Sequence, residues 1–370
     1  MKRKAAGFAL IALGLVLFAL LALRAAPGRD APAPSAAAAG PSAPVPTFSP
    51  SPAPTPSPSP APTPTPTPSS SPTPTPRPLL APALSSGEID PSFFEPCEEA
   101  GTLLQDVAYT TQDYIWKQEG EKEKFMQVYL PYGYDENGRY DVLFLIHVRM
   151  LNERYWLENV HGYHLPDRSS QTGSAVVMLD NLIARGYCQP LIVVSLHGYL
   201  DEGMAALHVS EQVYPQFREE FARDILPFVA GHYATWAEDT TREALSAARR
   251  HFGLFGASFG AYETELSVLA PNLDLVSWFS MTGGGSVTRD YLEPLWSQHG
   301  TLGLPIDLLY LAEGEYDDRG PVELSYLDLG RWSEVFTPEE NLRFTLLGGV
   351  GHEEPEWMAA LFNTVQLMFR

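Results

Sequence analysis

Short apolar runs recur along the chain from about residue 95 to its end, separated by longer segments of mixed polarity. Each run is apolar at successive positions, a pattern typical of strands that are buried on both faces of a sheet. The predicted strands include Phe125–Leu130, Val142–His147, Leu191–Leu196, Phe252–Phe255, Val276–Phe279, Ile306–Leu311 and Leu342–Leu347.

Amphipathic segments lie between these runs. In Ser174–Arg185 and Phe217–Tyr233 the apolar residues recur at spacings of three and four, and the segments after Phe259 and after Pro355 share this pattern. Short strands that alternate with helices predict an α/β fold, in which helices cover both faces of a mostly parallel sheet. We assign this domain to residues 95–370. The sequence contains no internal repeat.

The N-terminal pattern is different, because a basic cluster (Lys2-Arg3-Lys4) precedes an uncharged apolar run from Ala5 to Leu23. As a helix this run would extend about 29 Å at roughly 1.5 Å per residue, which matches a bilayer core. Residues 1–26 are therefore predicted to form a single transmembrane anchor, with the rest of the chain outside the cell. The alternative is a cleaved signal peptide, which would leave the protein secreted.

Proline is concentrated between these two parts of the chain. Residues 27–94 consist largely of Ala, Pro, Ser and Thr and contain most of the 34 prolines of the 370-residue chain. Such a composition cannot bury enough apolar surface to offset the entropy of ordering, so we predict a disordered linker. Alternating prolines favour an extended polyproline II conformation, which makes the segment a spacer.

Charge and cysteine content exclude several classes of function. The chain has 45 acidic and 24 basic residues and a formal charge of -21, which argues against a nucleic-acid backbone as a partner. Its 2 cysteines exclude a zinc site built on four thiolates. Outside the cell a disulfide between Cys97 and Cys188 could persist, but their spacing does not decide whether they pair.

The most informative segment is His251–Tyr262, in which an apolar run leads into Gly256-Ala-Ser258-Phe-Gly260 and then into a predicted helix. This arrangement is the nucleophile elbow, whose sharp turn requires small residues two positions before and after the nucleophile. A glycine-rich packing turn or a phosphate loop is the alternative, yet neither the dinucleotide nor the P-loop pattern is present. Ser258 is therefore the predicted nucleophile.

A serine nucleophile needs a base and an acid that orients the base, and in hydrolases with this elbow they follow in the order acid, then histidine. Only His299 and His352 follow Ser258. His299 precedes the last acid-bearing strand end, so His352 is the predicted base, although it could also be a surface loop residue. Four carboxylates compete for the role of acid after one strand, and we choose Asp317 with Asp318 as the alternative.

Several segments together resemble a known family. They are Tyr129–Tyr134, Asp180–Gly186, Pro190–Val194, Phe221–Phe228, Gly256–Gly260, Ala312–Asp317, and Gly351-His352 followed by Trp357. From about residue 105 onward the chain resembles the esterase D-like α/β-hydrolases, especially the feruloyl and acetyl-xylan esterases of carbohydrate esterase family 1. The resemblance implies an eight-stranded hydrolase sheet, a Ser258–Asp317–His352 triad, no metal or other cofactor, and ester substrates attached to sugars.

One segment departs from the family pattern. Where the family has His-Gly and further glycines that contribute to the oxyanion hole, this chain has His147-Val148-Arg149-Met150-Leu151. A β-branched residue cannot easily adopt the positive φ available to glycine, so we expect the contribution of Val148 to be impaired. The backbone N–H of Phe259, at the start of a predicted helix, should remain as an oxyanion donor.

These observations lead to one main functional hypothesis and two alternatives. The chain is predicted to be a membrane-anchored extracellular serine esterase that cleaves feruloyl- or acetyl-type esters of carbohydrates, or small esters, through an acyl-enzyme. A catalytically weakened relative that binds cell-wall carbohydrate is one alternative. An acyltransferase is the other, because a sugar hydroxyl can capture the same acyl-enzyme in place of water.

Overall fold

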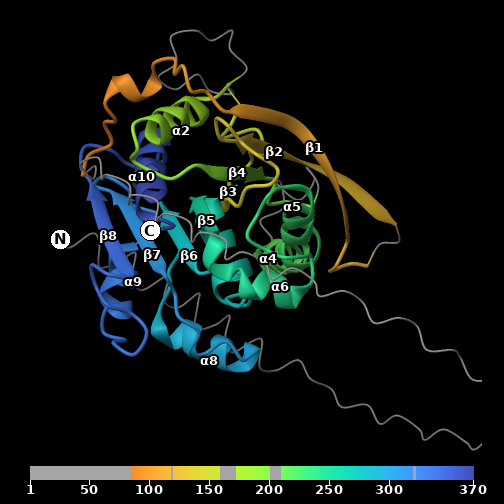
Figure 1. The fold of residues 1–370 in the computed structure, drawn as a ribbon. Helices are drawn as coiled ribbons and strands as arrows, with labels where there is room; N and C mark the ends of the chain where they lie inside the picture. The colour runs from red at the N-terminus through yellow and green to blue at the C-terminus, as the bar shows by residue number, and fades with distance from the viewer. Residues whose placement is uncertain (1–84, 118–119, 159–171, 201–209, 320–321) are drawn as a thin grey trace, which may run out of the picture. The chain divides into compact units, whose positions relative to one another are not determined.

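The computed structural model describes residues 85–117, 120–158, 172–200, 210–319 and 322–370 (Figure 1). All of them belong to one compact unit, Thr73–Arg370, whereas a second unit, Met1–Pro72, lies outside the described residues. The predicted anchor (1–26) and most of the predicted linker therefore also lie outside them. No helix within the described ranges is long and apolar enough to cross a membrane.

Eight strands form a single sheet in the order β1-β2-β4-β3-β5-β6-β7-β8. Their bounds are β1 (Thr102–Gln112), β2 (Glu121–Leu130), β3 (Asp141–Ile146), β4 (Leu191–Leu196), β5 (Phe252–Ala257), β6 (Trp278–Thr282), β7 (Leu308–Gly314) and β8 (Leu342–Leu347). β2 pairs antiparallel with β1 and with β4, and all other pairs are parallel. The predicted mostly parallel, eight-stranded sheet is confirmed.

Helices cover both faces of this sheet, as predicted (Figure 1). One face packs against η1 (Pro91–Phe94), α2 (Ser174–Ala184) and α10 (Glu354–Leu367). The other packs against α4 (Ser210–Glu220), η2 (Phe221–Ile225), α5 (Leu226–His232), α6 (Arg242–Ala247), α7 (Phe259–Glu263), η4 (Thr264–Leu269), α8 (Arg289–His299) and α9 (Val322–Leu329), while η3 (Arg249–His251) leads into β5. Successive side chains of a strand alternate between the two faces of the sheet. In β3, Leu143 and Leu145 therefore point to the face covered by α2 and α10, and Val142 and Phe144 point to the opposite face.

The predicted boundary between linker and domain at residues 94 and 95 is wrong. Residues 85–94, assigned to the linker, belong to the folded unit, and Phe93 and Phe94 are buried in the core beside α2. The side-chain amide of Asn181 donates hydrogen bonds to the carbonyls of Phe93 (3.1 Å) and Glu95 (2.8 Å). The two phenylalanines supply apolar area that the Pro-Ser-Thr tract lacks, which is why the segment orders.

The two cysteines, whose pairing the sequence left open, are both free thiols in the structure. Cys188 is buried in the core on the α2 side, and burial raises the pKa of its thiol to about 12. Cys97 is half-buried. Cys188 therefore behaves as a small core residue that remains protonated at neutral pH.

Candidate active site

The residues predicted to carry the chemistry follow three strands of the parallel part of the sheet. Ser258 comes directly after β5, Asp317 lies in the loop after β7, and His352 lies in the loop after β8. The carboxyl ends of parallel strands share one edge of the sheet, so these three loops emerge at the same edge. The topology thus brings together residues that are far apart in the sequence.

Ser258 occupies a strained turn between β5 and α7. Its backbone has φ 53° and ψ -113°, a region that residues other than glycine rarely adopt, and its N–H donates to the Thr282 carbonyl at 2.9 Å. A Cβ atom added to Gly256 would lie 2.0 Å from the Gly260 carbonyl oxygen, and one added to Gly260 would lie 2.5 Å from the Ile146 carbonyl oxygen. The turn therefore requires glycine at both positions, as the elbow pattern predicted.

The side chains of Ser258, His352 and Asp317 form a continuous chain of hydrogen bonds. His352 Nε2 lies 2.9 Å from Ser258 Oγ, and His352 Nδ1 lies 2.9 Å from Asp317 Oδ2. With the proton on Nδ1, the imidazole donates to the carboxylate and accepts from the serine hydroxyl. Asp318, the alternative acid, is exposed, and His299 lies at the C-terminal end of α8.

Asp317 is held as an anion although its side chain is fully buried. Its Oδ1 accepts the backbone N–H of Arg319 at 2.8 Å, while Oδ2 accepts from His352. Burial alone would raise the pKa of Asp317, but these hydrogen bonds outweigh it and hold the pKa below its usual value. The buried charge can therefore orient the imidazole and stabilise a positive charge on it.

Phe259 follows the candidate nucleophile and is part of a group of stacked rings. Its ring stacks on Tyr199 with centroids 4.6 Å apart, on His147 at 5.8 Å and on Tyr214 at 6.0 Å. As the first residue of α7, Phe259 has a backbone N–H that lacks an intrahelical acceptor. The stacked rings fix the start of the helix, and with it this N–H, directly beside Ser258.

The loop after β3 is the segment that departs from the family pattern. Val148 stands where the family has glycine, and it does not have positive φ; the residue of this loop with positive φ is Met150, at 63°. The Leu151 N–H lies 3.4 Å from the Val148 carbonyl, which makes Met150 the third residue of a turn, the position that requires positive φ in a type II turn. Val148 thus lacks the glycine-like conformation, as expected for a β-branched residue, and the positive φ of this loop lies two residues further along, at Met150. The impaired contribution of Val148 to the oxyanion hole stays a prediction.

His147 links this loop to the loop after β4, a contact that sequence reasoning did not anticipate. Its ring is buried, with Nδ1 2.7 Å from the Val148 carbonyl and Nε2 3.1 Å from the Gly198 N–H. Nδ1 therefore carries the proton, since Nε2 accepts. Burial lowers the pKa of His147 to about 4, so the ring is neutral. Its two hydrogen bonds connect the Val148 carbonyl to the Gly198 N–H.

Glu356 is a second residue that sequence reasoning missed. In the sequence it belongs to a run, Glu353-Glu-Pro-Glu356, that resembles a solvated helix start, but the structure buries Glu356 completely. Three side-chain atoms that could bind a metal ion lie within 4.8 Å of one another, one each from Asp317, His352 and Glu356. Both ring nitrogens of His352 are already hydrogen-bonded, so a metal ion there would displace Ser258 or Asp317.

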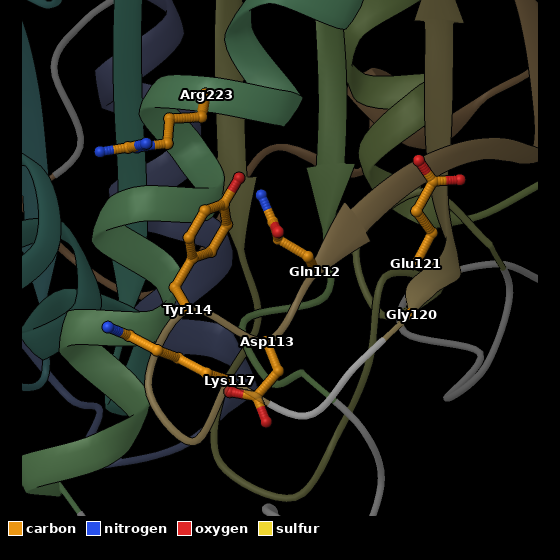
Figure 2. A pocket seen from close by; sticks show the side chains of 7 residues that line it. All are labelled: Gln112, Asp113, Tyr114, Lys117, Gly120, Glu121 and Arg223. Carbon is orange, nitrogen blue, oxygen red and sulfur yellow. The ribbon is translucent and has the colours of Figure 1, made fainter. Parts of the chain in front are cut away.

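A hollow of about 500 Å³ lies at the end of the β1–β2 hairpin (Figure 2). Tyr114 lines this hollow and contacts η2. Its hydroxyl donates to Asp224 Oδ2 at 2.8 Å, and the guanidinium carbon of Arg223 lies 5.6 Å from its ring centroid. None of its lining residues is Ser258, His352 or Asp317. The hollow is thus not part of the hydrogen-bonded chain described above.

Comparison with known proteins supports the predicted resemblance. No family model matches the chain. Endo-1,4-beta-xylanase Y from Acetivibrio thermocellus is 31% identical over 193 residues, which cover 52% of this chain and 15% of that protein. Endo-1,4-beta-xylanase/feruloyl esterase from Xylanibacter ruminicola is 26% identical over 185 residues, or 49% of this chain and 22% of that protein. The chain thus spans less than a quarter of the length of these relatives.

Solved structures with a similar fold confirm the α/β-hydrolase architecture. A mutant of the feruloyl esterase module from Clostridium thermocellum, complexed with sinapinate, gives a TM-score of 0.57 at 23% identity, covering 76% of this chain and 93% of that one. A ferulic acid esterase of carbohydrate esterase family 1 from Anaeromyces mucronatus gives a TM-score of 0.53 at 20% identity. This match covers 77% of this chain and 97% of that one. The resemblance to this group of esterases, predicted from the motifs, is confirmed at the level of the fold.

Proposed function

We propose that this chain is a serine esterase that hydrolyses feruloyl- or acetyl-type esters of carbohydrates through an acyl-enzyme. The observation that carries the proposal is the hydrogen-bonded chain from Ser258 through His352 to Asp317, at a nucleophile elbow on the carboxyl edge of the sheet. The substrate class is supported by the similar proteins, whose names include xylanase and feruloyl esterase. The proposed reaction requires no metal or other cofactor.

In the proposed mechanism Ser258 Oγ attacks the ester carbonyl while His352 Nε2 accepts its proton. Asp317 holds the Nδ1 proton and stabilises the imidazolium that forms. His352 then returns the proton to the leaving alcohol, and water repeats the sequence on the acyl-enzyme. We assign the two oxyanion donors to the backbone N–H groups of Phe259 and Val148, the first positioned by ring stacking and the second by His147.

The proposal includes a location for the enzyme. Residues 1–26 would anchor the chain in the cell membrane, and the Pro-rich segment after them would carry the esterase domain away from the surface outside the cell. Cleavage of the N-terminal segment would instead release a secreted enzyme. The apolar run from Ala5 to Leu23 and the composition of the linker support both versions.

The alternatives have less support. A catalytically weakened, carbohydrate-binding relative is suggested by Val148, a β-branched residue where the family has glycine, whereas the hydrogen-bonded chain from Ser258 to Asp317 favours the esterase. An acyltransferase would use the same acyl-enzyme and differ only in the acceptor. Incubation with a feruloylated sugar and an excess of a second sugar distinguishes the two activities, since hydrolysis yields free ferulate and transfer yields a new sugar ester.

A fluorophosphonate probe tests the proposal without assuming a substrate. Such a probe phosphonylates serines that are activated by a neighbouring base, so the full chain should be labelled at Ser258. Ser258→Ala should not be labelled, whereas the control Ser297→Ala, at an exposed serine in α8, should be labelled like the wild type. An unlabelled wild-type chain that is folded would contradict an activated nucleophile.

A further inference from the structure

Glu356 lies in the first turn of α10 and is fully buried between the ends of β6 and β7. Its Oε1 accepts the Thr282 hydroxyl at 2.8 Å. A Cβ atom added to Gly283 would lie 3.1 Å from Oε1, and one added to Gly314 would lie 2.8 Å from Oε2. The two glycines therefore allow the backbone to approach the carboxyl group more closely than a larger residue would permit.

The second oxygen of this carboxyl group has an unusual environment. Oε2 is buried and has no hydrogen-bond donor in good geometry within the described part of the chain. The neighbouring carboxyl group is that of Asp317, one of whose oxygens lies within 4.8 Å of a carboxyl oxygen of Glu356. Two buried carboxylates cannot both be ionised at this separation without a large cost, whereas one proton between them satisfies both oxygens.

The surroundings indicate which of the two carries the proton. Asp317 already accepts hydrogen bonds from His352 and from the Arg319 N–H, and these hold its pKa below the usual value. Burial, together with the charge of Asp317, raises the pKa of Glu356 to about 8, against the opposing effects of Thr282 and the Gly314 backbone. Asp317, in the loop after β7, and His352, before α10, are the titratable groups that face Glu356 among the described residues.

We propose that Glu356 is a positioning residue, a neutral carboxylic acid that donates a hydrogen bond to Asp317 and fixes this carboxylate for its bond to His352. The inference rests on the proposed function, because it assigns Glu356 a role in support of the same triad. Asp317 is then held by three donors, the His352 ring, the Arg319 backbone and the Glu356 acid. Glu356 acts through Asp317 and does not contact the reacting atoms.

Two substitutions separate donation from packing. Glu356→Gln keeps the size of the side chain and offers an amide N–H to Asp317, so it should retain most of the wild-type kcat at pH 7. Glu356→Met has a similar length but no donor, and its kcat should fall about 10–100-fold with KM nearly unchanged, the loss expected for one hydrogen bond to a charged group. Equal activity of the two variants would overturn the proposal.

The pH profile gives a readout that packing alone does not change. In the wild type, activity should fall as the pH rises through about 8, because loss of the Glu356 proton breaks the bond and places a second negative charge beside Asp317. Glu356→Gln has no such proton, so this alkaline decline should be absent. A decline of the same size in both proteins would contradict a protonated Glu356.

Thermal unfolding tests whether Glu356 is protonated in the folded protein, even if the esterase activity itself is absent. A carboxyl group whose pKa is raised on folding binds more protons in the native than in the unfolded state, so it destabilises the protein increasingly as the pH rises. The melting temperature of the wild type should therefore fall relative to Glu356→Gln between about pH 4.5 and pH 8 and then level off. A constant difference across this range would refute the proposal, whereas an inactive wild type that shows the trend would refute only the proposed function.

Discussion

His352 and Asp317 are joined by a 2.9 Å hydrogen bond between Nδ1 and Oδ2, although 35 positions separate them in the sequence. β7 and β8 are neighbouring parallel strands, so the loops that follow them leave the same edge of the sheet side by side. The loop after β7 turns at Gly314, whose carbonyl accepts the Asp317 N–H at 3.0 Å, and the Asp317 side chain is directed inward. The pair can therefore orient one imidazole tautomer toward Ser258.

Exchange of each neighbouring acid for its amide tests which one orients the base. Asp317→Asn should lower kcat by about 10⁴, because the amide favours the wrong imidazole tautomer and removes the buried charge. Asp318→Asn should change kcat less than about twofold, since the Asp318 side chain is exposed. Steady-state hydrolysis of an activated aryl ester measures both variants, and the opposite ranking would assign the role to Asp318.

Ser258→Ala separates the chemical role of the serine from its structural role. The variant should lose more than nine-tenths of the aryl esterase activity, because the nucleophile is gone. Its melting temperature should stay within a few degrees of the wild type, since Ala fits the same turn between Gly256 and Gly260. Activity above a tenth of the wild-type value, in a protein freed of contaminating esterases, would contradict the assignment of Ser258.

Much of the fold could be predicted because its central strands are buried on both faces. β3, β4 and β5 are almost continuously apolar, and each was predicted close to its observed bounds. β1 was missed because it is an edge strand, paired only with β2, in which most residues are exposed or half-buried. A strand of this kind lacks the apolar run that identifies the central ones.

The site was predictable where backbone geometry demands particular residues, and not where tertiary packing decides. Gly256 and Gly260 are required by the elbow, and they identify Ser258 from the sequence. The burial of Glu356 depends on how the first turn of α10 meets the ends of β6 and β7, which no local pattern reveals. The register of the turn at Met150 is similarly a property of the folded loop rather than of its residue types.

His147 should make the protein sensitive to acid. Its pKa is lowered to about 4 in the native state, so between about pH 4 and 6.5 the unfolded state binds a proton that the native state does not. Stability therefore falls as the pH decreases through this range, by about 2 kcal/mol at pH 5 from this residue. His147→Gln has no titrating group, so the difference in unfolding free energy between the two proteins should shift by this amount from pH 7 to pH 5.

The nearby His197 is a useful check on this prediction. Burial also lowers its pKa, to about 2, so it contributes a similar dependence that remains in His147→Gln. The variant should therefore lose part of the acid sensitivity, not all of it. Urea titrations at several pH values give the free energies, and parallel curves for the wild type and His147→Gln would show that His147 does not stay neutral.

Met150 offers the most direct test of the loop that differs from the family pattern. Its φ of 63° costs a residue with a side chain about 1–2 kcal/mol, and the residue is 66% exposed, so little packing would be lost on removal of its side chain. Met150→Gly relieves this strain but adds roughly 0.5–1 kcal/mol of unfolded-state entropy, so the net gain should be about 0.5–1 kcal/mol. Urea denaturation measures the gain, and kcat should stay close to the wild-type value.

Val148→Gly is the matched control, because it introduces glycine at the position where the family has it and where the oxyanion contribution was expected to be impaired. Val148 does not have positive φ and the residue is only 6% exposed, so glycine there removes buried apolar area and relieves no backbone strain. We expect a loss of about 1–3 kcal/mol and, because the loosened backbone carries a proposed oxyanion donor, a lower kcat. A stable Val148→Gly with a raised kcat, beside a destabilised Met150→Gly, would show that the impaired position is Val148 after all.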